Sequence, residues 1–307
     1  SYRREAGHLY HTHDASRGAL RDVYSSDHSQ PAESARGVVA TSRDSKRHQG
    51  RGGPSLSAAF DVMVQADPGP FIRGVSLGSM FVPEKWMTPS FYAGSEAASL
   101  CELVRMNRTD AASRMRRHLH SFVAEEDFAW LAARGYNAVR VPLGYWNAVD
   151  VEGGIPYVPD ASESLQVLDR LFDWGDAHGL GLLLDMHAAP GSQNGADHSG
   201  CDSDGINWHT EPDNIRLSLA AIDALARRYG PHSALLGIEV LNEPAWAVEW
   251  DHGQLLEYYT RAADLVYAAS PRAYVVFNVL YGGDFPSGFG DWWTGQLVSD
   301  RVLIDLH

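Results

Sequence analysis

An α/β fold is predicted for this chain, namely an incomplete (β/α)8 barrel (TIM barrel) with about six of its eight β/α units. From residue 71 onward, short apolar runs alternate with amphipathic stretches, and polar residues follow the runs. Alternating strands and helices favour a parallel sheet. A doubly wound nucleotide-binding fold would need a glycine-rich phosphate loop after the first strand. The segment 74–78 lies within or beside that strand and is followed by Met80, Phe81 and Pro83, so we favour the barrel.

The predicted strands are short apolar runs. The continuous run at 180–184 is typical of a strand buried on both faces, as in parallel sheets. The six predicted strands cover residues 72–77, 138–142, 180–184, 235–241, 274–277 and 302–304.

Helices are predicted between these strands. One ends at Arg134 and begins with three acidic residues, Glu125 to Asp127, where carboxylates meet the positive end of the helix dipole. A second, over 162–178, has apolar residues at helical spacing and ends at Gly179. A third begins near Thr210 and runs to Tyr229, and a fourth covers 253–269.

The domain organisation follows from a change in composition near residue 70. Residues 1–70 contain no Trp and no Cys, whereas all nine Trp lie from Trp86 onward. We expect an N-terminal extension of unknown role, partly disordered, over 1–70 and the barrel over 71–307. His8, His11 and His13 resemble a metal cluster, but no carboxylate or Cys at fixed spacing supports one, so a solvated tail is favoured.

Composition excludes several classes of protein. A net charge of −14 disfavours a nucleic-acid partner, which needs clustered Lys and Arg. No stretch reaches the ~18 apolar residues of a membrane span, and no signal peptide is visible. Cys101 and Cys201 show no CxxC or zinc spacing, and both a disulfide and free thiols remain open.

Polar residues stand at successive strand ends. Arg140 lies in the second strand, His187 ends the third, Asn242 and Glu243 end the fourth, and His307 ends the sixth. Each alone is a weak signal, but barrel enzymes carry their chemistry at the carboxyl ends of the strands, so together they indicate an active site. Asp185 and His187 alternate on one strand, yet a hydrolytic metal site needs three or four ligands. We therefore expect no metal and no cofactor.

Five segments carry a family resemblance: RGVSLGSMFVPEKWMTPSFY (73–92), EEDFAWLAARGYNAVRVPLGYW (125–146), LLLDMHAAPGSQNGADHSG (182–200), GIEVLNEP (237–244) and VLIDLH (302–307). With these the chain resembles glycoside hydrolase family five, and it looks closest to the branch of the fungal exo-β-1,3-glucanases. The resemblance implies a retaining hydrolase of β-glucosidic bonds in glucans, with an oligo- or polysaccharide substrate. It also implies a monomer that works outside the cell or at its surface.

The resemblance also implies roles for single residues. Glu243 would be the acid/base, with a pKa raised by burial and by a negative neighbour. Asn242 would bind the sugar 2-hydroxyl, and Arg140 would orient the nucleophile. His187 and His307 would bind hydroxyls or hold the carboxylates. The substrate-binding residues would be Glu84, Trp86, Asn194, Asp197 and His198, although Trp86 has the alternative of a core aromatic.

The chain departs from the family pattern at three places. It has Gly78-Ser79-Met80 where the glucanases have Gly-Gly-Trp, and Ala196-Asp197-His198 where they have Phe-Asp-Asn, which argues against strict exo-β-1,3 specificity. The family places its nucleophilic Glu on a seventh strand, and the chain ends at His307, before strands seven and eight. We therefore expect residues 1–307 alone to be inactive. A non-catalytic carbohydrate-binding pseudoenzyme is the alternative; retention of Glu243 and Arg140 favours the enzyme.

Overall fold

The computed structural model describes residues 71–150, 158–199, 205–245, 252–280 and 301–306. The predicted N-terminal extension over 1–70, His307 and Cys201 lie outside the described residues. Cys101 is fully buried and forms a disulfide, so the alternative of a free thiol is wrong for this residue.

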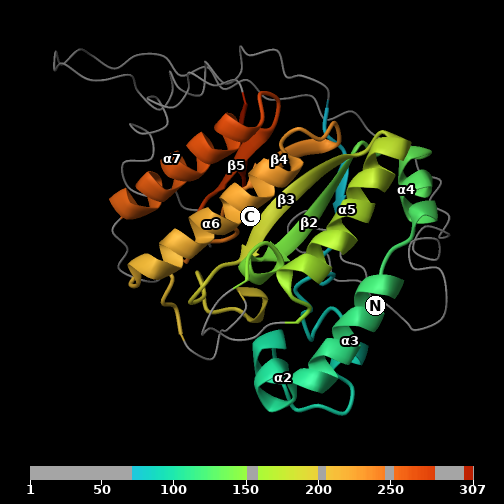
Figure 1. The fold of residues 1–307 in the computed structure, drawn as a ribbon, viewed down its shortest axis with the longest axis vertical. Helices are drawn as coiled ribbons and strands as arrows, with labels where there is room; N and C mark the ends of the chain where they lie inside the picture. Colours follow the sequence, from blue (N-terminus) through green and yellow to red (C-terminus); the bar gives the residue numbers. More distant parts are fainter. Residues whose placement is uncertain (1–70, 151–157, 200–204, 246–251, 281–300, 307) are drawn as a thin grey trace, which may run out of the picture.

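The described strands form one parallel sheet that follows the order of the chain, β1-β2-β3-β4-β5-β6 (Figure 1). Adjacent strands pair in register, for example Val139 with Leu182 and Leu184 with Ile238. A doubly wound sheet would reverse its strand order part-way, so the prediction of an incomplete barrel is confirmed. The strands are β1 (Gly74–Ser76), β2 (Ala138–Gly144), β3 (Gly181–Ala188), β4 (Leu235–Glu239), β5 (Tyr274–Asn278) and β6 (Val302–Asp305).

Long helices cover the outer face of this sheet. In Figure 1, α5 (Ala161–His178), α6 (Pro212–Tyr229) and α7 (His252–Ala269) lie on this face, and each joins two neighbouring strands of the sheet. The other α-helices of the described residues are α4 (Glu125–Ala132), which leads into β2, and α2 (Leu100–Met106) and α3 (Arg108–Ser121), which the sequence analysis did not predict. Among the described helices, none is both long enough and apolar enough to cross a membrane.

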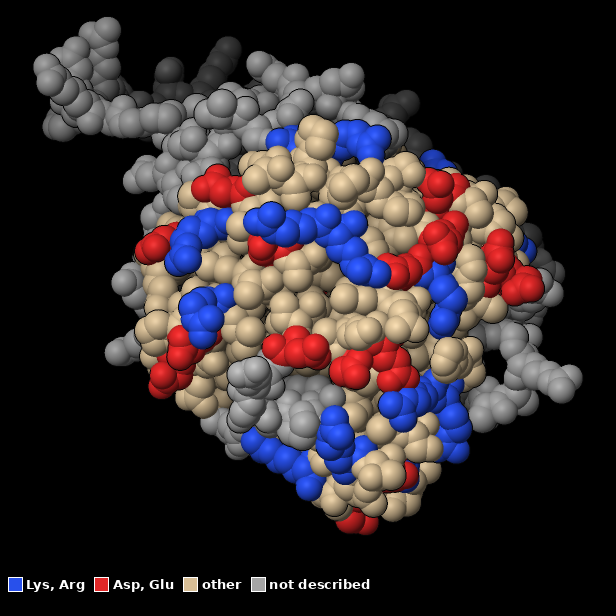
Figure 2. Space-filling model, in the orientation of Figure 1, with Lys and Arg blue, Asp and Glu red and all other residues tan. Residues whose placement is uncertain are grey.

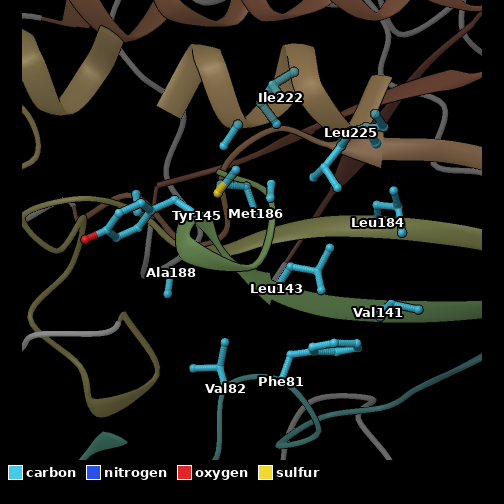
Figure 3. Packing of buried hydrophobic residues seen from close by; sticks show 14 of the residues in the cluster. Phe81, Val82, Val141, Leu143, Tyr145, Leu184, Met186, Ala188, Ile222 and Leu225 are labelled. Atoms are coloured by element: carbon cyan, nitrogen blue, oxygen red, sulfur yellow. The ribbon is translucent and has the colours of Figure 1, made fainter. Parts of the chain in front are cut away.

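Alternation along the strands sorts side chains between the two faces of the sheet. Met186 and Leu184 of β3 lie on the side of Ile222 and Leu225 of α6 (Figure 3). Their neighbours along the strand, such as Asp185, therefore point to the inner face. Gly175 of α5 lets the helix lie close to the sheet, because an added Cβ would come within 2.4 Å of Leu182 Cδ1 and 2.8 Å of Leu180 O.

The outer helices present mixed charges to solvent. Figure 2 shows acidic and basic side chains interspersed over this face of the molecule. Several form ion pairs, among them Arg228 with Asp169 across α5 and α6, and Arg227 with Asp223 within α6. Such exposed pairs contribute little to stability.

Candidate active site

A buried ion-pair network lies on the inner face of the sheet, centred on Arg140 of β2. Its guanidinium donates from Nε to Glu239 Oε2 and from Nη2 to Glu239 Oε1, each at 2.8 Å, and Nη2 lies 3.0 Å from Asp185 Oδ2. Pro142 pairs with Asp185 and Asp185 with Glu239 across β2, β3 and β4, so register brings both carboxylates to the same side as Arg140. Both carboxylate side chains are inaccessible to solvent.

Charge balance keeps this network ionised. Burial alone would lower the pKa of Arg140, but the negative charges of Asp185 and Glu239 outweigh it and hold the pKa well above its usual value. Asn278 at the end of β5 adds a hydrogen bond from Nδ2 to Glu239 Oε1 at 2.9 Å. The sequence analysis missed Glu239. Its signal was a lone charged residue inside the apolar run 235–241.

Asn242 follows β4 and is tied to the same network. Its Oδ1 accepts a hydrogen bond from Arg140 Nη2 at 2.9 Å, and the residue is fully buried. In the described part of the chain, Asn242 Nδ2 is buried and has no hydrogen-bond partner. A buried donor without a partner is costly, so this amide suits a ligand that brings an acceptor oxygen, as a sugar hydroxyl does.

Glu243 occupies the next position in a strained conformation. Its φ of 45° is in the left-handed region, which non-glycine residues seldom adopt. Its side chain is 14 % exposed, and its Oε2 lies 3.1 Å from His198 Nε2. The carboxyl group is therefore mostly enclosed yet still reachable, as a proton donor to a bound ligand must be.

The loop after β3 joins this site to the rest of the sheet through Gln193. Its Nε2 donates to His187 O at 2.8 Å and to Asn242 O at 3.0 Å, so one side chain links the ends of β3 and β4. Asn194 Nδ2 donates to Glu243 O at 3.1 Å. Gly191, with a φ of 73°, permits the turn, and a Cβ there would come within 2.2 Å of Asn214 Nδ2.

Glu84 enters the site from the loop after β1. It is only 4 % exposed, and its Oε2 accepts a hydrogen bond from Trp86 Nε1 at 2.8 Å. Burial raises the pKa of Glu84, and the opposing effects of His198 and the Trp86 hydrogen bond do not cancel that rise. Trp86 itself is 55 % exposed, so the alternative of a core aromatic is wrong.

One group of side chains has the composition of a metal site. Potential ligand atoms of Glu84, Asp197 and His198 all lie within 4.8 Å of one another. One imidazole with two carboxylates is a ligand set that zinc accepts. The sequence analysis had considered His8, His11 and His13, and separately Asp185 with His187, for a metal. It placed Glu84, Asp197 and His198 in the substrate site.

Comparison with known proteins assigns the family. The sequence pattern described as "Cellulase (glycosyl hydrolase family 5)" matches residues 107–296. The chain belongs to glycosyl hydrolase family 5. It is 37 % identical over 242 residues to "Probable glucan 1,3-beta-glucosidase A" of Emericella nidulans, which covers 77 % of this chain and 56 % of the relative. The protein of the same name from Aspergillus niger is 34 % identical over 82 % of this chain and 57 % of its own length.

Solved structures agree on the fold of this family 5 chain. The crystal structure of rutinosidase from Aspergillus niger matches 76 % of the chain with a TM-score of 0.63 and 18 % identity, over 68 % of its own length. A structure named AoRut matches 77 % of the chain and 68 % of its own length, with the same TM-score of 0.63 and 21 % identity. The chain spans little more than half the length of the curated relatives above.

Most residues predicted for the family 5 site meet in one place. The structure links Arg140 with Asn242, Glu243 with His198, Asn194 with Glu243, and Glu84 with Trp86. His187 Nδ1 lies 2.6 Å from Asp185 Oδ2, and its ring centroid lies 5.0 Å from that of His198. His307 is outside the described residues, so its predicted role stays a prediction.

Proposed function

We propose that the protein is a retaining glycoside hydrolase that cleaves β-glucosidic bonds in glucans, with Glu243 as its acid/base. The observation that carries the proposal is the pair at the end of β4: the Glu243 carboxyl group, mostly enclosed, directly follows Asn242, whose buried Nδ2 lacks a partner in the described chain. Membership of family 5 and the names of the curated relatives support the same reading.

Glu243 supplies the proton chemistry of this reaction. It protonates the oxygen of the leaving sugar while a second carboxylate attacks the anomeric carbon, and the glycosidic bond breaks. It then takes a proton from water as that water attacks the glycosyl-enzyme. The nucleophile is expected on a strand after residue 307, as the family resemblance implies, so the proposal concerns the full-length protein.

Asn242 and Arg140 assist in different ways. Asn242 Nδ2 donates to the sugar 2-hydroxyl, a hydrogen bond that strengthens in the transition state. Arg140 holds Asn242 Oδ1 at 2.9 Å, so the amide is already oriented before the sugar binds. Its positive charge also favours the ionised form of a nearby nucleophile.

For the substrate we propose β-1,3-linked glucan. Glu84, Trp86, Asn194, Asp197 and His198 form the sugar-binding part of the site. Trp86 is 55 % exposed and anchored by its Nε1 to Glu84, so its ring is available for stacking on a sugar. Comparison of kcat/KM on laminari-, cello- and manno-oligosaccharides tests this choice, and a clear preference for cellotriose would overturn it.

For the whole protein we propose an extracellular or cell-surface monomer whose catalytic barrel begins near residue 71. The carbohydrate substrate of the family and the fungal glucan glucosidases among the relatives support this location. Secretion is tested by locating the full-length protein in culture medium and cell fractions.

The decisive experiment replaces Glu243 in the full-length protein. Glu243→Ala should cut hydrolysis of unactivated β-glucosides by at least ~10²–10⁴-fold, the usual contribution of a general acid/base. Azide should restore turnover of an activated aryl β-glucoside and give the β-glycosyl azide. Glu257→Gln is the matched control, because Glu257 is 72 % exposed and pairs only loosely with Arg261 at 3.9 Å. Near-normal hydrolysis by the Glu243 variant would refute the assignment. Binding of glucan without turnover by the wild type would favour the pseudoenzyme.

A further inference from the structure

An acceptor triplet for N-linked glycans lies at an exposed junction between two helices. Of the asparagines in the sequence, Asn107 alone is followed two residues later by Ser or Thr, here with Arg108 and Thr109. An Asn-x-Ser/Thr triplet whose central residue is not proline is the acceptor pattern of N-glycosylation. In the structure the triplet lies where α2 ends and α3 begins, at the lower end of Figure 1, and all three of its residues are exposed.

The fold fixes Asn107 but uses only one atom of its side-chain amide. Oδ1 accepts a hydrogen bond from Asp110 N at 3.1 Å and so caps the first turn of α3. The main-chain N–H of Asn107 donates to Leu103 O at 2.9 Å and closes α2. Among the described residues, none accepts a hydrogen bond from Asn107 Nδ2. The nitrogen that a glycan would occupy is therefore not committed to the fold.

A sugar on Nδ2 is compatible with the cap. N-glycosylation replaces one of the two hydrogens on Nδ2 and leaves Oδ1 an amide oxygen, so Oδ1 still accepts from Asp110 N. The cap by itself explains less of the triplet, because Asp or Ser would serve equally well at this position and neither needs a hydroxyl two residues later. Thr109, which supplies that hydroxyl, is exposed at the second position of α3.

The surface next to the triplet would also benefit from a glycan. Met106, the last residue of α2 and the neighbour of Asn107, is 60 % exposed. A single exposed apolar side chain is common, but this one lies directly beside the acceptor asparagine. A glycan is bulky and hydrophilic, so on Asn107 it covers apolar surface that the fold itself leaves open.

We propose that Asn107 carries an N-linked glycan in the full-length protein. This inference goes beyond the catalytic proposal and rests on the extracellular or cell-surface location, because N-glycans are added in the secretory pathway. The donor is an oligosaccharide linked to a polyprenyl diphosphate. Asn107 Nδ2 forms a bond to C1 of the first N-acetylglucosamine, and the bond between C1 and the diphosphate oxygen breaks. The polyprenyl diphosphate leaves with the electron pair of that bond, and Nδ2 gives up one proton.

The test examines Asn107 in the full-length protein secreted by a fungal host. Peptide-N-glycosidase F should convert a glycosylated Asn107 to Asp, which mass spectrometry detects. Glutamyl endopeptidase gives the peptide to be measured, because it cuts after Glu102 and does not cut at Arg105 or Arg108.

Two variants remove the acceptor and one matched control keeps it. Asn107→Asp removes Nδ2 but keeps a good capping oxygen, and Thr109→Ala leaves the cap untouched, so both should lose the glycopeptide while retaining kcat/KM on β-glucosides. Thr109→Ser makes a change of similar size but preserves the triplet, so it should retain the glycopeptide.

The possible results separate this inference from the catalytic proposal. A secreted protein with unmodified Asn107 would overturn the inference alone. A protein that stays in the cytosol, with Asn107 unmodified, would reject the proposed location and the inference together. Loss of the glycopeptide in Thr109→Ser as complete as in Thr109→Ala would show that the modification does not follow the triplet, and the inference would fail. A glycosylated Asn107 in a secreted but inactive wild type would support the inference and reject the proposed activity.

Discussion

Replacing Glu239 by Gln tests whether the Arg140 network holds the inner face of the sheet together. The substitution keeps the shape of the side chain but removes one of the two carboxylates that neutralise Arg140. In the wild type, one Glu239 carboxylate oxygen accepts from Arg140 Nε, and the other accepts from both Arg140 Nη2 and Asn278 Nδ2. Whichever way the glutamine amide of the variant turns, its NH2 group therefore faces a donor. Breaking a buried pair typically costs 3–5 kcal/mol. Asp185 remains 3.0 Å from Arg140, so we expect the lower end, about 3 kcal/mol.

Urea unfolding of the full-length protein, followed by tryptophan fluorescence, measures this loss. Asp223→Asn is the matched control, because Arg227 Nε and Asp223 Oδ2 are also 2.8 Å apart, but the arginine side chain is 73 % exposed. Exposed i,i+4 pairs contribute only about 0.3–0.5 kcal/mol. A loss below about 1 kcal/mol for Glu239→Gln, or an equal loss for Asp223→Asn, would contradict the argument that burial decides the strength of these pairs.

Three further predictions follow from the site. Ser79→Ala should destabilise the protein by about 1–3 kcal/mol, because Ser79 Oγ accepts from Glu84 N at 2.8 Å and contacts Thr88 Oγ1 at 2.7 Å. Ser79→Gly loses the same bonds but relieves a φ of 68°, so it should be about 1 kcal/mol more stable than Ser79→Ala in urea unfolding; equal stabilities would refute this. The raised pKa of His198 should stabilise the fold below its unfolded pKa of about 6.5, and this contribution should be lost as pH rises through the folded pKa. The difference in unfolding free energy between wild type and His198→Asn should therefore shrink from pH 6 to pH 9. A difference that grows over this range would mean that folding lowers the pKa of His198, which would contradict the prediction. EDTA should leave hydrolysis unchanged, because Glu243 acts without a metal; loss of activity that zinc restores would instead assign the Glu84, Asp197 and His198 group to a metal.

The strands could be predicted from the sequence because each is a short apolar run, which is typical of a strand buried in a parallel sheet. Their bounds were less accurate: β3 runs to Ala188, four residues beyond the predicted end at Leu184. The polar residues Asp185 and His187 interrupt the apolar run, yet they remain in the strand because they bond to each other at 2.6 Å on the inner face. Helix α3 was missed because its buried residues are few, although Ala111, Met115 and Leu119 keep helical spacing.

The site could be predicted where it depends on strand ends and not where it depends on strand register or loop conformation. Asn242 and Glu243 follow from the rule that barrel chemistry lies at the carboxyl ends of strands. Arg140 was expected near a strand end, but it lies within β2, which continues to Gly144. Glu239 lies 99 residues from Arg140, and only the pairing of β2, β3 and β4 brings the two together. The contact of His198 with Glu243 depends on the path of the loop after β3, which has no periodic pattern to read.

Backbone strain is concentrated in the loops that build the candidate site. Three non-glycine residues in the described chain have positive φ: Ser79 at 68°, Ser192 at 60° and Glu243 at 45°. They lie in the loops after β1, β3 and β4, which also carry Glu84, His198 and Asn242. Such conformations cost on the order of 1–3 kcal/mol each and persist only where the surroundings enforce them. At Ser79 and Ser192 the side-chain oxygen bonds a neighbouring main-chain nitrogen, Glu84 N at 2.8 Å and Gly195 N at 2.8 Å, so the strained residue also fixes the turn that follows. At Glu243 the main-chain oxygen is held instead, by Asn194 at 3.1 Å. In each case hydrogen bonds within the site loops hold the strained residue in place and offset part of the strain, which is the arrangement expected if selection acted on the geometry of the site more strongly than on the stability of its loops.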